Sequence, residues 1–502
     1  MRAGLLGPFT VTIRHALCCL AAAALAAALG SCSGGNDDDG LPVVTIGNSE
    51  SIFDEGLRLS SGAQLVRDAT SSGIVALNAE GEVVPALGES WIVTEDGQSF
   101  IFRLRQVTWP DGEPLTAEDA RASLTETIAA LRGTSLGLDL RKVAEIRAMT
   151  TRVIEIRLTG QMPEFLHLLA QPELAISRDG QTIGPMRMER EGDVAILRPT
   201  PREQIGLPER DGPQPGKTVR LRALPGPEAN SAFSDGEAGA LLDGSIFTLP
   251  LANTGPLSRG TIRLDPALGL FGMIVTNEQG FLSEVENREA LSMAIDRAAL
   301  LEQFSLGGWQ PSARIVPPGL PGDFGMVGER WPGLTLDNRR SEARQRATAW
   351  SRETGQPARV RLWLPDGPGS DRLMDALSLD LASIGVELRR VQFAQGADLV
   401  MIDRLARYPS SRWFLNQFNC ALLPGPCSPD ADTLVTESLS AGNAADAGNL
   451  LLEAESALLA REVYIPLGAP VRWSLVRSGL EGFSENPWSR HPLYALAGVE
   501  AW

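Results

Sequence analysis

A glycine-flanked serine is the first feature of this 502-residue chain that could do chemistry. Residues 133–137 read Gly-Thr-Ser-Leu-Gly, the Gly-x-Ser-x-Gly pattern of the esterase nucleophile elbow. That elbow needs a strand before the serine and a helix after it, so that a sharp turn exposes the hydroxyl. Here Ser135 follows the predicted end of a helix at Gly133, which favours a helix cap and a loop. We predict no catalytic residue, and a hydrolase that uses Ser135 is the competing function.

Two other patterns could hold a phosphate or a metal ion. Residues 212–218, GPQPGKT, have three residues between the glycines where a phosphate loop has four, and the prolines remove backbone N–H donors. His167 and His491 are the only histidines outside the first 31 residues, and no other candidate ligands cluster with them in the sequence. We therefore predict no cofactor and no metal site.

The charge balance excludes some partners. The formal net charge is -17, which argues against nucleic acid and against anionic lipid headgroups. The length predicts two or three lobes rather than one core.

The elements that would position a site are clearest in residues 84–131. Phe100, Phe102 and Leu104 alternate with other residues, which predicts a strand with one buried face. Thr116, three residues before Asp119, is a capping signal for a helix that reaches to Leu131.

The same stretch resembles a segment of the family 5 solute-binding proteins, the oligopeptide, dipeptide and nickel receptors of ABC importers. The matching residues are Pro85-Ala86-Leu87, Glu89-Ser90-Trp91, Phe102-Arg103-Leu104-Arg105, Asp111-Gly112 and Leu115-Thr116-Ala117-Glu118-Asp119. Residues 287–297, NREALSMAIDR, and residues 315–319, IVPPG, are also similar to the family. The resemblance implies an α/β periplasmic-binding-protein-like fold (type II, cluster C). Two large lobes with mixed sheets would be joined by a hinge, with an extra subdomain on the first lobe.

The N-terminus reads as a targeting segment. Residues 16–29 form an apolar run that is short for a membrane-spanning helix and typical of a signal peptide. The following Leu29-Gly30-Ser31-Cys32 resembles a bacterial lipobox, which implies that Cys32 carries the lipid. The alternative is a cleaved signal without a lipid. In an exported protein, Cys420 and Cys427, separated by a Pro/Gly loop, are expected to form a disulfide.

These features predict an order of domains along the chain. The expected segments are 1–31 (lipoprotein signal peptide), 32–40 (flexible tether), 41–72 (first part of lobe I), 73–179 (extra subdomain of lobe I), 180–263 (second part of lobe I), 264–476 (lobe II) and 477–502 (return to lobe I).

Arg407 marks a departure from the family pattern. Residues 406–414, ARYPSSRWF, align with the peptide receptors' "aDY.DP..fl", whose Asp pairs with the α-amine of a peptide. A charge pair at 4 Å contributes roughly 4 kcal/mol at an effective dielectric near 20, so an Arg there would repel an amine. We expect Arg407 to favour an anionic or amine-blocked ligand; the alternative is that it faces solvent or that the register slips. Asn277, Tyr408 and Trp413 are further candidate ligand contacts, each equally plausible as core.

The resemblance implies capture of a solute rather than a reaction. A peptide-like or other small solute would be held between two hinged lobes and delivered to ABC permease subunits. The protein is expected to be a periplasmic monomer that touches a bacterial membrane only through its lipid anchor. Besides the exported hydrolase, a sensor or chaperone-like relative of the same fold is an alternative.

Overall fold

The computed structural model describes residues 40–208, 216–252, 261–320 and 330–501. Residues 41–502 form one compact unit. The predicted signal peptide, Cys32 and most of the 212–218 pattern lie outside the described residues. No helix in the described part of the chain is long and apolar enough to cross a bilayer.

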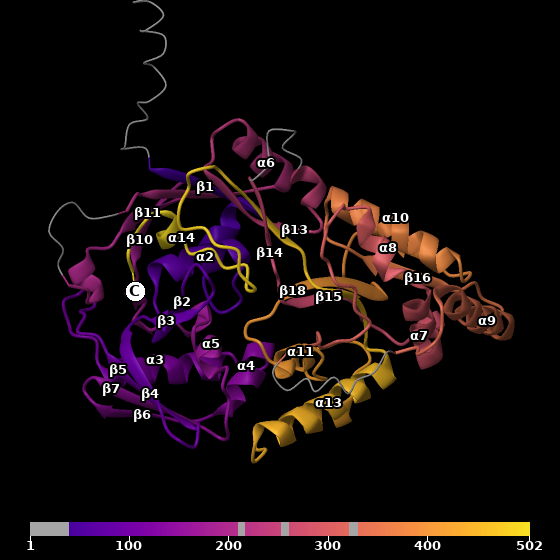
Figure 1. Ribbon diagram of the computed structural model, residues 1–502, viewed down its shortest axis with the longest axis horizontal. Coiled ribbons are helices and arrows are strands. Elements are labelled where there is room, and N and C mark those ends of the chain that lie inside the picture. Colours follow the sequence, from indigo (N-terminus) through magenta and orange to yellow (C-terminus); the bar gives the residue numbers. More distant parts are fainter. Residues whose placement is uncertain (1–39, 209–215, 253–260, 321–329, 502) are drawn as a thin grey trace, which may run out of the picture. The chain divides into compact units, whose positions relative to one another are not determined.

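A seven-stranded mixed sheet is assembled from the start, the middle and the end of the chain (Figure 1). Its central strand β1 pairs in parallel with both of its neighbours, whereas the outer strands pair antiparallel. In spatial order the strands are β10 (Met186–Glu191), β11 (Val194–Pro199), β12 (Val219–Leu224), β1 (Leu41–Ile46), β13 (Ala240–Ser245), β20 (Arg472–Val476) and β14 (Ile262–Asp265). Helices α2 (Ser61–Thr70) and α14 (Leu493–Leu496) contribute to an apolar core on this sheet.

A four-stranded antiparallel sheet follows, in the order β4 (Gly88–Val93), β5 (Ser99–Leu104), β7 (Val153–Leu158) and β6 (Val143–Thr150). Phe100, Phe102 and Leu104 of β5 are buried, as their alternation predicted. Helix α3 (Ala117–Ala130) begins at the predicted cap, where Thr116 and Asp119 form a reciprocal capping box. A two-stranded pair, β2 (Val75–Leu77) with β3 (Val83–Pro85), precedes this sheet.

A five-stranded sheet forms the remaining body. Its order is β17 (Glu387–Arg390), β16 (Arg359–Trp363), β18 (Leu399–Leu405), β15 (Gly269–Val275) and β19 (Tyr464–Gly468). Strands β16 and β17 are parallel and are connected by α10 (Pro368–Ala382), so the three elements form a βαβ unit. Helices α7 (Val285–Ala294) and α9 (Leu336–Thr354) pack against each other (Figure 1).

The strand pairing differs from the expected division at both ends of the 264–476 segment. Leu264 lies in β14, and residues 472–476 form β20; both strands belong to the seven-stranded sheet because they pair with each other and β20 also pairs with β13. The chain passes to the five-stranded sheet between Asp265 and Gly269 and returns between Gly468 and Arg472. These two short segments connect the seven-stranded sheet to the five-stranded sheet.

One apolar cluster covers parts of two bodies. It contains buried residues of the four-stranded sheet and its helices together with Leu270, Ile402, Tyr408 and Phe414 from the five-stranded body. Helix α4 (Ser135–Asp139) packs against α11 (Ser411–Asn416) within it. The region around Arg407 is therefore held by packing from both sides.

Candidate functional site

Arg407 lies in the loop that follows β18, where the chain leaves the five-stranded sheet. Its side chain is 26% exposed and contacts Glu173 of the short helix η3 (Pro172–Leu174). Nη2 donates to one carboxylate oxygen of Glu173 at 3.0 Å, and Nη1 donates to the other at 3.3 Å. Each carboxylate oxygen thus receives a hydrogen bond from a different nitrogen, the geometry that makes Arg–carboxylate pairs strong and specific.

Two glutamines extend this ion pair into a network. Arg407 Nη1 also donates to Gln171 Oε1 at 3.0 Å and to Gln64 Oε1 of α2 at 3.4 Å. Gln171 Nε2 donates in return to the backbone carbonyl of Arg407 at 2.9 Å. The loop carrying Arg407 is therefore fixed at its backbone as well as at its guanidinium.

A second ion pair lies beside the first. Arg490 donates to Asp68 of α2 at 2.7 Å and to Gln171 Oε1 at 3.2 Å, so Gln171 connects the two arginines. Burial raises the pKa of Asp68, and the charge of Arg490 opposes that rise. Burial likewise lowers the pKa of Arg407, which Glu173 opposes. Two carboxylates thus balance two guanidinium groups.

Tyr408 and Trp413 lie in the core. Tyr408 is fully buried, and its hydroxyl donates to Asp139 Oδ1 at 2.7 Å. Asn416 Nδ2 donates to the same oxygen at 2.6 Å. Burial raises the pKa of Asp139 to about 6 and that of Tyr408 well above its ordinary value. Trp413 is 4% exposed and packs edge-on against Phe414.

Asn277 follows the end of β15 and orders a turn. Its Nδ2 donates to Asp398 Oδ1 at 2.9 Å, and its Oδ1 accepts from the backbone N–H of Gln279 at 3.1 Å. Asp398 in turn pairs with Arg361 at 2.7 Å. None of these contacts connects Asn277 to the network around Arg407.

A groove of about 1250 Å³ lies next to the Arg407–Glu173 pair. Its walls are formed by residues 52–57, one side of α2, the loop around Trp109 and residues 172–190, and they mix polar with apolar side chains. Glu173 lines this groove, whereas Arg407, Tyr408, Trp413 and Asn277 do not. Ligand sites of small-molecule receptors have volumes of about 300–1,000 Å³, so the groove has room for a small solute.

Arg67 of α2 is a further charged residue that lines the groove. Its Nη1 donates to the Gly56 carbonyl at 2.7 Å. Burial lowers its pKa, and the charges of Glu173, Asp68 and Glu55 oppose that effect.

Sequence reasoning did not find Glu173, Gln171, Asp68 or Arg490. No local motif marks them, because Asp68 and Arg490 are 422 positions apart and Glu173 and Arg407 are 234 apart. The one available signal was Glu173 itself, an acidic residue within the largely apolar run 165–176 that the structure buries.

Ser135 is the first residue of α4, and Thr134 caps that helix by accepting a hydrogen bond from the Gly137 N–H at 3.0 Å. Helix α3 and a turn precede it, so the strand that a nucleophile elbow requires is missing at this point. Among the described residues, no three His, Cys, Asp or Glu side chains are grouped so that they could hold a metal ion.

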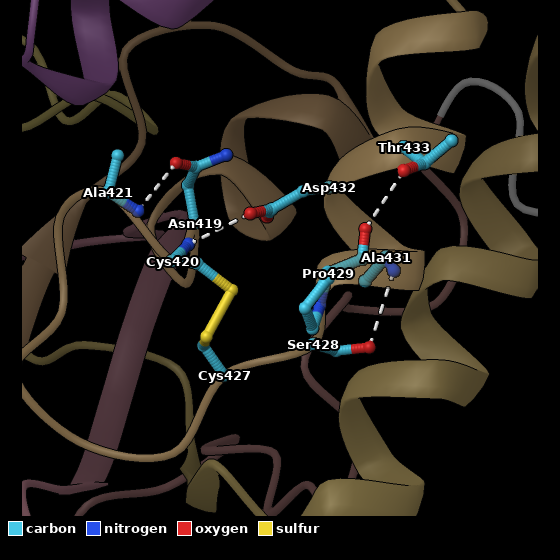
Figure 2. Close-up of a disulfide and its surroundings, with 9 residues drawn as sticks. All are labelled: Asn419, Cys420, Ala421, Cys427, Ser428, Pro429, Ala431, Asp432 and Thr433. Atoms are coloured by element: carbon cyan, nitrogen blue, oxygen red, sulfur yellow. Dashed lines mark hydrogen bonds between the residues drawn. A yellow bond between two sulfur atoms is a disulfide. The ribbon is translucent and has the colours of Figure 1, made fainter.

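Cys420 and Cys427 form a disulfide with Cα atoms 5.2 Å apart (Figure 2). The backbone N–H of Cys420 donates to Asp432 Oδ2 at 3.0 Å, and Ser428 Oγ caps helix α12 (Pro429–Glu437). The bridge therefore fixes the loop against the start of α12.

Three comparisons with known proteins all find similarity to solute-binding proteins. The family of bacterial extracellular solute-binding proteins, family 5, matches residues 82–196. The nickel-binding periplasmic protein of Escherichia coli is 23% identical over 63% of this chain and 64% of its own length. The periplasmic oligopeptide-binding protein OppA of E. coli is 22% identical over 84% of this chain and 86% of its own length. OppA of Haemophilus influenzae, solved with the peptide RPPGFSPFR, superposes with a TM-score of 0.76 at 17% identity, covering 93% of this chain and 100% of that one.

Proposed function

Because the chain belongs to the family 5 extracellular solute-binding proteins, we propose that it captures a small solute outside the cytoplasm and delivers it unchanged to an ABC permease. The observation that carries this proposal is the superposition on the peptide complex of H. influenzae OppA over 93% of the chain. The relatives are periplasmic binding proteins for nickel and oligopeptides.

The solute is not held through a free peptide amine at residue 407. Arg407 has no negative charge to offer, and its guanidinium is already bound to Glu173, Gln171 and Gln64. An anionic solute would have to displace Glu173 from Arg407, which would leave a buried carboxylate without its partner. Of the two classes expected from the sequence, the amine-blocked solute is therefore favoured over the anionic one, and an uncharged solute would meet the same requirement.

The groove beside Glu173 is where we expect the solute to lie. The residues that line it all lie between Ile52 and Gln204, and Glu173 connects its wall to Arg407 of the five-stranded body. The two short segments at residues 266–268 and 469–471 are suited to act as a hinge, because few backbone dihedrals there would have to change. A solute that touches Glu173 thus influences a contact between two bodies, which is what ligand-dependent closure requires.

Membrane attachment through Cys32 is the remaining part of the proposal. The lipobox-like sequence before Cys32 and the polar, Gly-rich residues 33–40 support an anchored, extracytoplasmic receptor with a flexible tether.

A paired ligand screen tests the solute class. Purified mature protein is titrated calorimetrically with di- and tripeptides in their free, N-acetylated, and N-acetylated and C-amidated forms, and each sample is also assayed for hydrolysis. We expect binding by members of the blocked or uncharged set, with no product formed. Tight binding of unblocked peptides that persists in Arg407→Ala would refute the solute class, and turnover of any peptide would refute transport without chemistry.

A further inference from the structure

The carboxylate of Glu173 has the features of a cation-binding site. Its side chain is 3% exposed, and both carboxylate oxygens are used by one guanidinium. Within the described residues, Arg407 is the only hydrogen-bond donor to this carboxylate. A buried carboxylate is costly without a compensating charge, so Glu173 depends strongly on Arg407, while Arg67 adds a positive charge without a hydrogen bond to it.

The cation comes from a different body of the protein. Glu173 belongs to the η3 segment beside α2, whereas Arg407 follows β18 of the five-stranded sheet. The hydrogen bond from Gln171 to the Arg407 carbonyl fixes the loop after β18, so the guanidinium reaches Glu173 from the five-stranded body. Glu173 meanwhile faces the groove, as do its neighbours Pro172 and Ala175. A small cation in the groove could therefore reach Glu173 if the guanidinium of Arg407 were absent.

We propose that Glu173 is a guanidinium- and ammonium-binding site that the protein fills with its own Arg407. Arg407 acts there as an internal ligand: it satisfies the carboxylate, joins the two bodies and closes the site to cationic end groups of other molecules. Removal of the Arg407 side chain opens a site for an alkylguanidinium ion. A planar guanidinium fits better than a compact ammonium, because it can donate to both oxygens at once.

This arrangement sets specificity. A solute whose main anchor is a cationic group gains nothing at Glu173 while Arg407 is in place. This consequence rests on the proposed function, whereas the cation site itself does not, because its test requires no natural solute.

The test is chemical rescue of Arg407→Ala with n-propylguanidinium, followed by calorimetry and by thermal unfolding. We expect the variant to bind the ion with a dissociation constant on the order of 1 mM and to gain thermal stability. The wild-type protein is expected to bind at least tenfold more weakly, and n-propylamine should rescue less well. The double variant Arg407→Ala with Glu173→Gln should lose the rescue, because the negative charge is gone.

Arg389→Ala is the matched control. It removes an arginine that pairs with Glu387 at 2.7 Å within strand β17, where both side chains are about half exposed. The ion should not stabilise this variant. A folded Arg407→Ala protein that shows no more binding than Arg389→Ala would overturn the proposal, as would equal rescue of the double variant.

If Arg407→Ala does not remain folded, the same ion decides the question during refolding. We expect n-propylguanidinium to raise the folded fraction of Arg407→Ala and not that of the Arg407→Ala, Glu173→Gln variant. Equal recovery of the two variants would contradict a cation site at Glu173. Failure of the solute screen with success of this rescue would reject the proposed function alone.

Discussion

Asp139 is expected to make the protein less stable as the pH rises from about 4 to about 6. Its side chain is fully buried, and Oδ1 accepts hydrogen bonds from Tyr408 and Asn416. Oδ2 has no hydrogen-bond partner among the residues that the structure describes. Burial raises the pKa from 3.8 to about 6, although the two hydrogen bonds and the charge of Arg412 oppose the rise.

The sign follows from the raised pKa. The folded protein binds this proton more tightly than the unfolded chain, so the contribution to stability is complete below pH 3.8 and is lost as the pH passes about 6. A rise of about 2 pKa units corresponds to roughly 3 kcal/mol, at about 1.36 kcal/mol per unit. Other carboxylates have lowered pKa values and act in the opposite direction, for example Glu155 beside Arg147. The effect must therefore be isolated by comparison with a variant.

Asp139→Asn supplies that comparison, because it removes the titration and keeps an oxygen for Tyr408 and Asn416. Urea unfolding is measured from about pH 4 to pH 7.5 for the wild type, for Asp139→Asn and for Asp375→Asn, a change on the exposed side of α10. The free energy of unfolding of the wild type should fall by roughly 3 kcal/mol relative to Asp139→Asn over this range. The control should follow the wild type. A constant difference between the wild type and Asp139→Asn would refute the account of a buried, raised carboxyl.

Three further predictions concern other parts of the chain. Replacement of both Cys420 and Cys427 by Ser should lower the free energy of unfolding by about 2.5 kcal/mol, the loop-closure estimate for a short loop, as measured by chemical unfolding with the wild type in reductant as control. Arg472→Ala should lower the free energy of unfolding by about 3–5 kcal/mol, because it leaves Asp403, whose side chain is 5% exposed, without the guanidinium that contacts both of its oxygens. The control Arg389→Ala should lower it by at most about 1 kcal/mol. Equal losses in the two variants would contradict this reasoning. Cys32→Ser should move the full-length chain from the membrane fraction to the soluble extract, and an unchanged distribution on fractionation would argue against lipid attachment.

Local sequence rules predicted much of the fold. The alternation at Phe100, Phe102 and Leu104 and the Thr116–Asp119 capping box depend on neighbours within a few residues, and both agree with the structure. In the β16–α10–β17 unit the connecting helix permits parallel pairing, because parallel strands need a long crossover connection. The ends of the expected segment 264–476 could not be predicted from local rules, because β14 and β20 join the seven-stranded sheet through pairing between distant residues.

The site was less predictable than the fold. The sequence singled out Arg407 through a departure from a family pattern, but its partners come from positions that only the tertiary structure brings together. Tyr408 and Trp413 were ambiguous, since an aromatic residue suits a ligand wall and a core equally well. In the structure, Tyr408 is part of the core, because its hydroxyl donates to the buried Asp139.

The central claim is that the protein holds a solute without altering it. Native mass spectrometry of the chain purified from its own compartment tests this most directly, with the spectrum recorded at once and again after several hours at 37 °C. The account predicts one bound small molecule per chain, recovered with the same mass at both times. A chain that carries no small molecule under any growth condition, or one whose bound mass is converted to a product during the incubation, would contradict it.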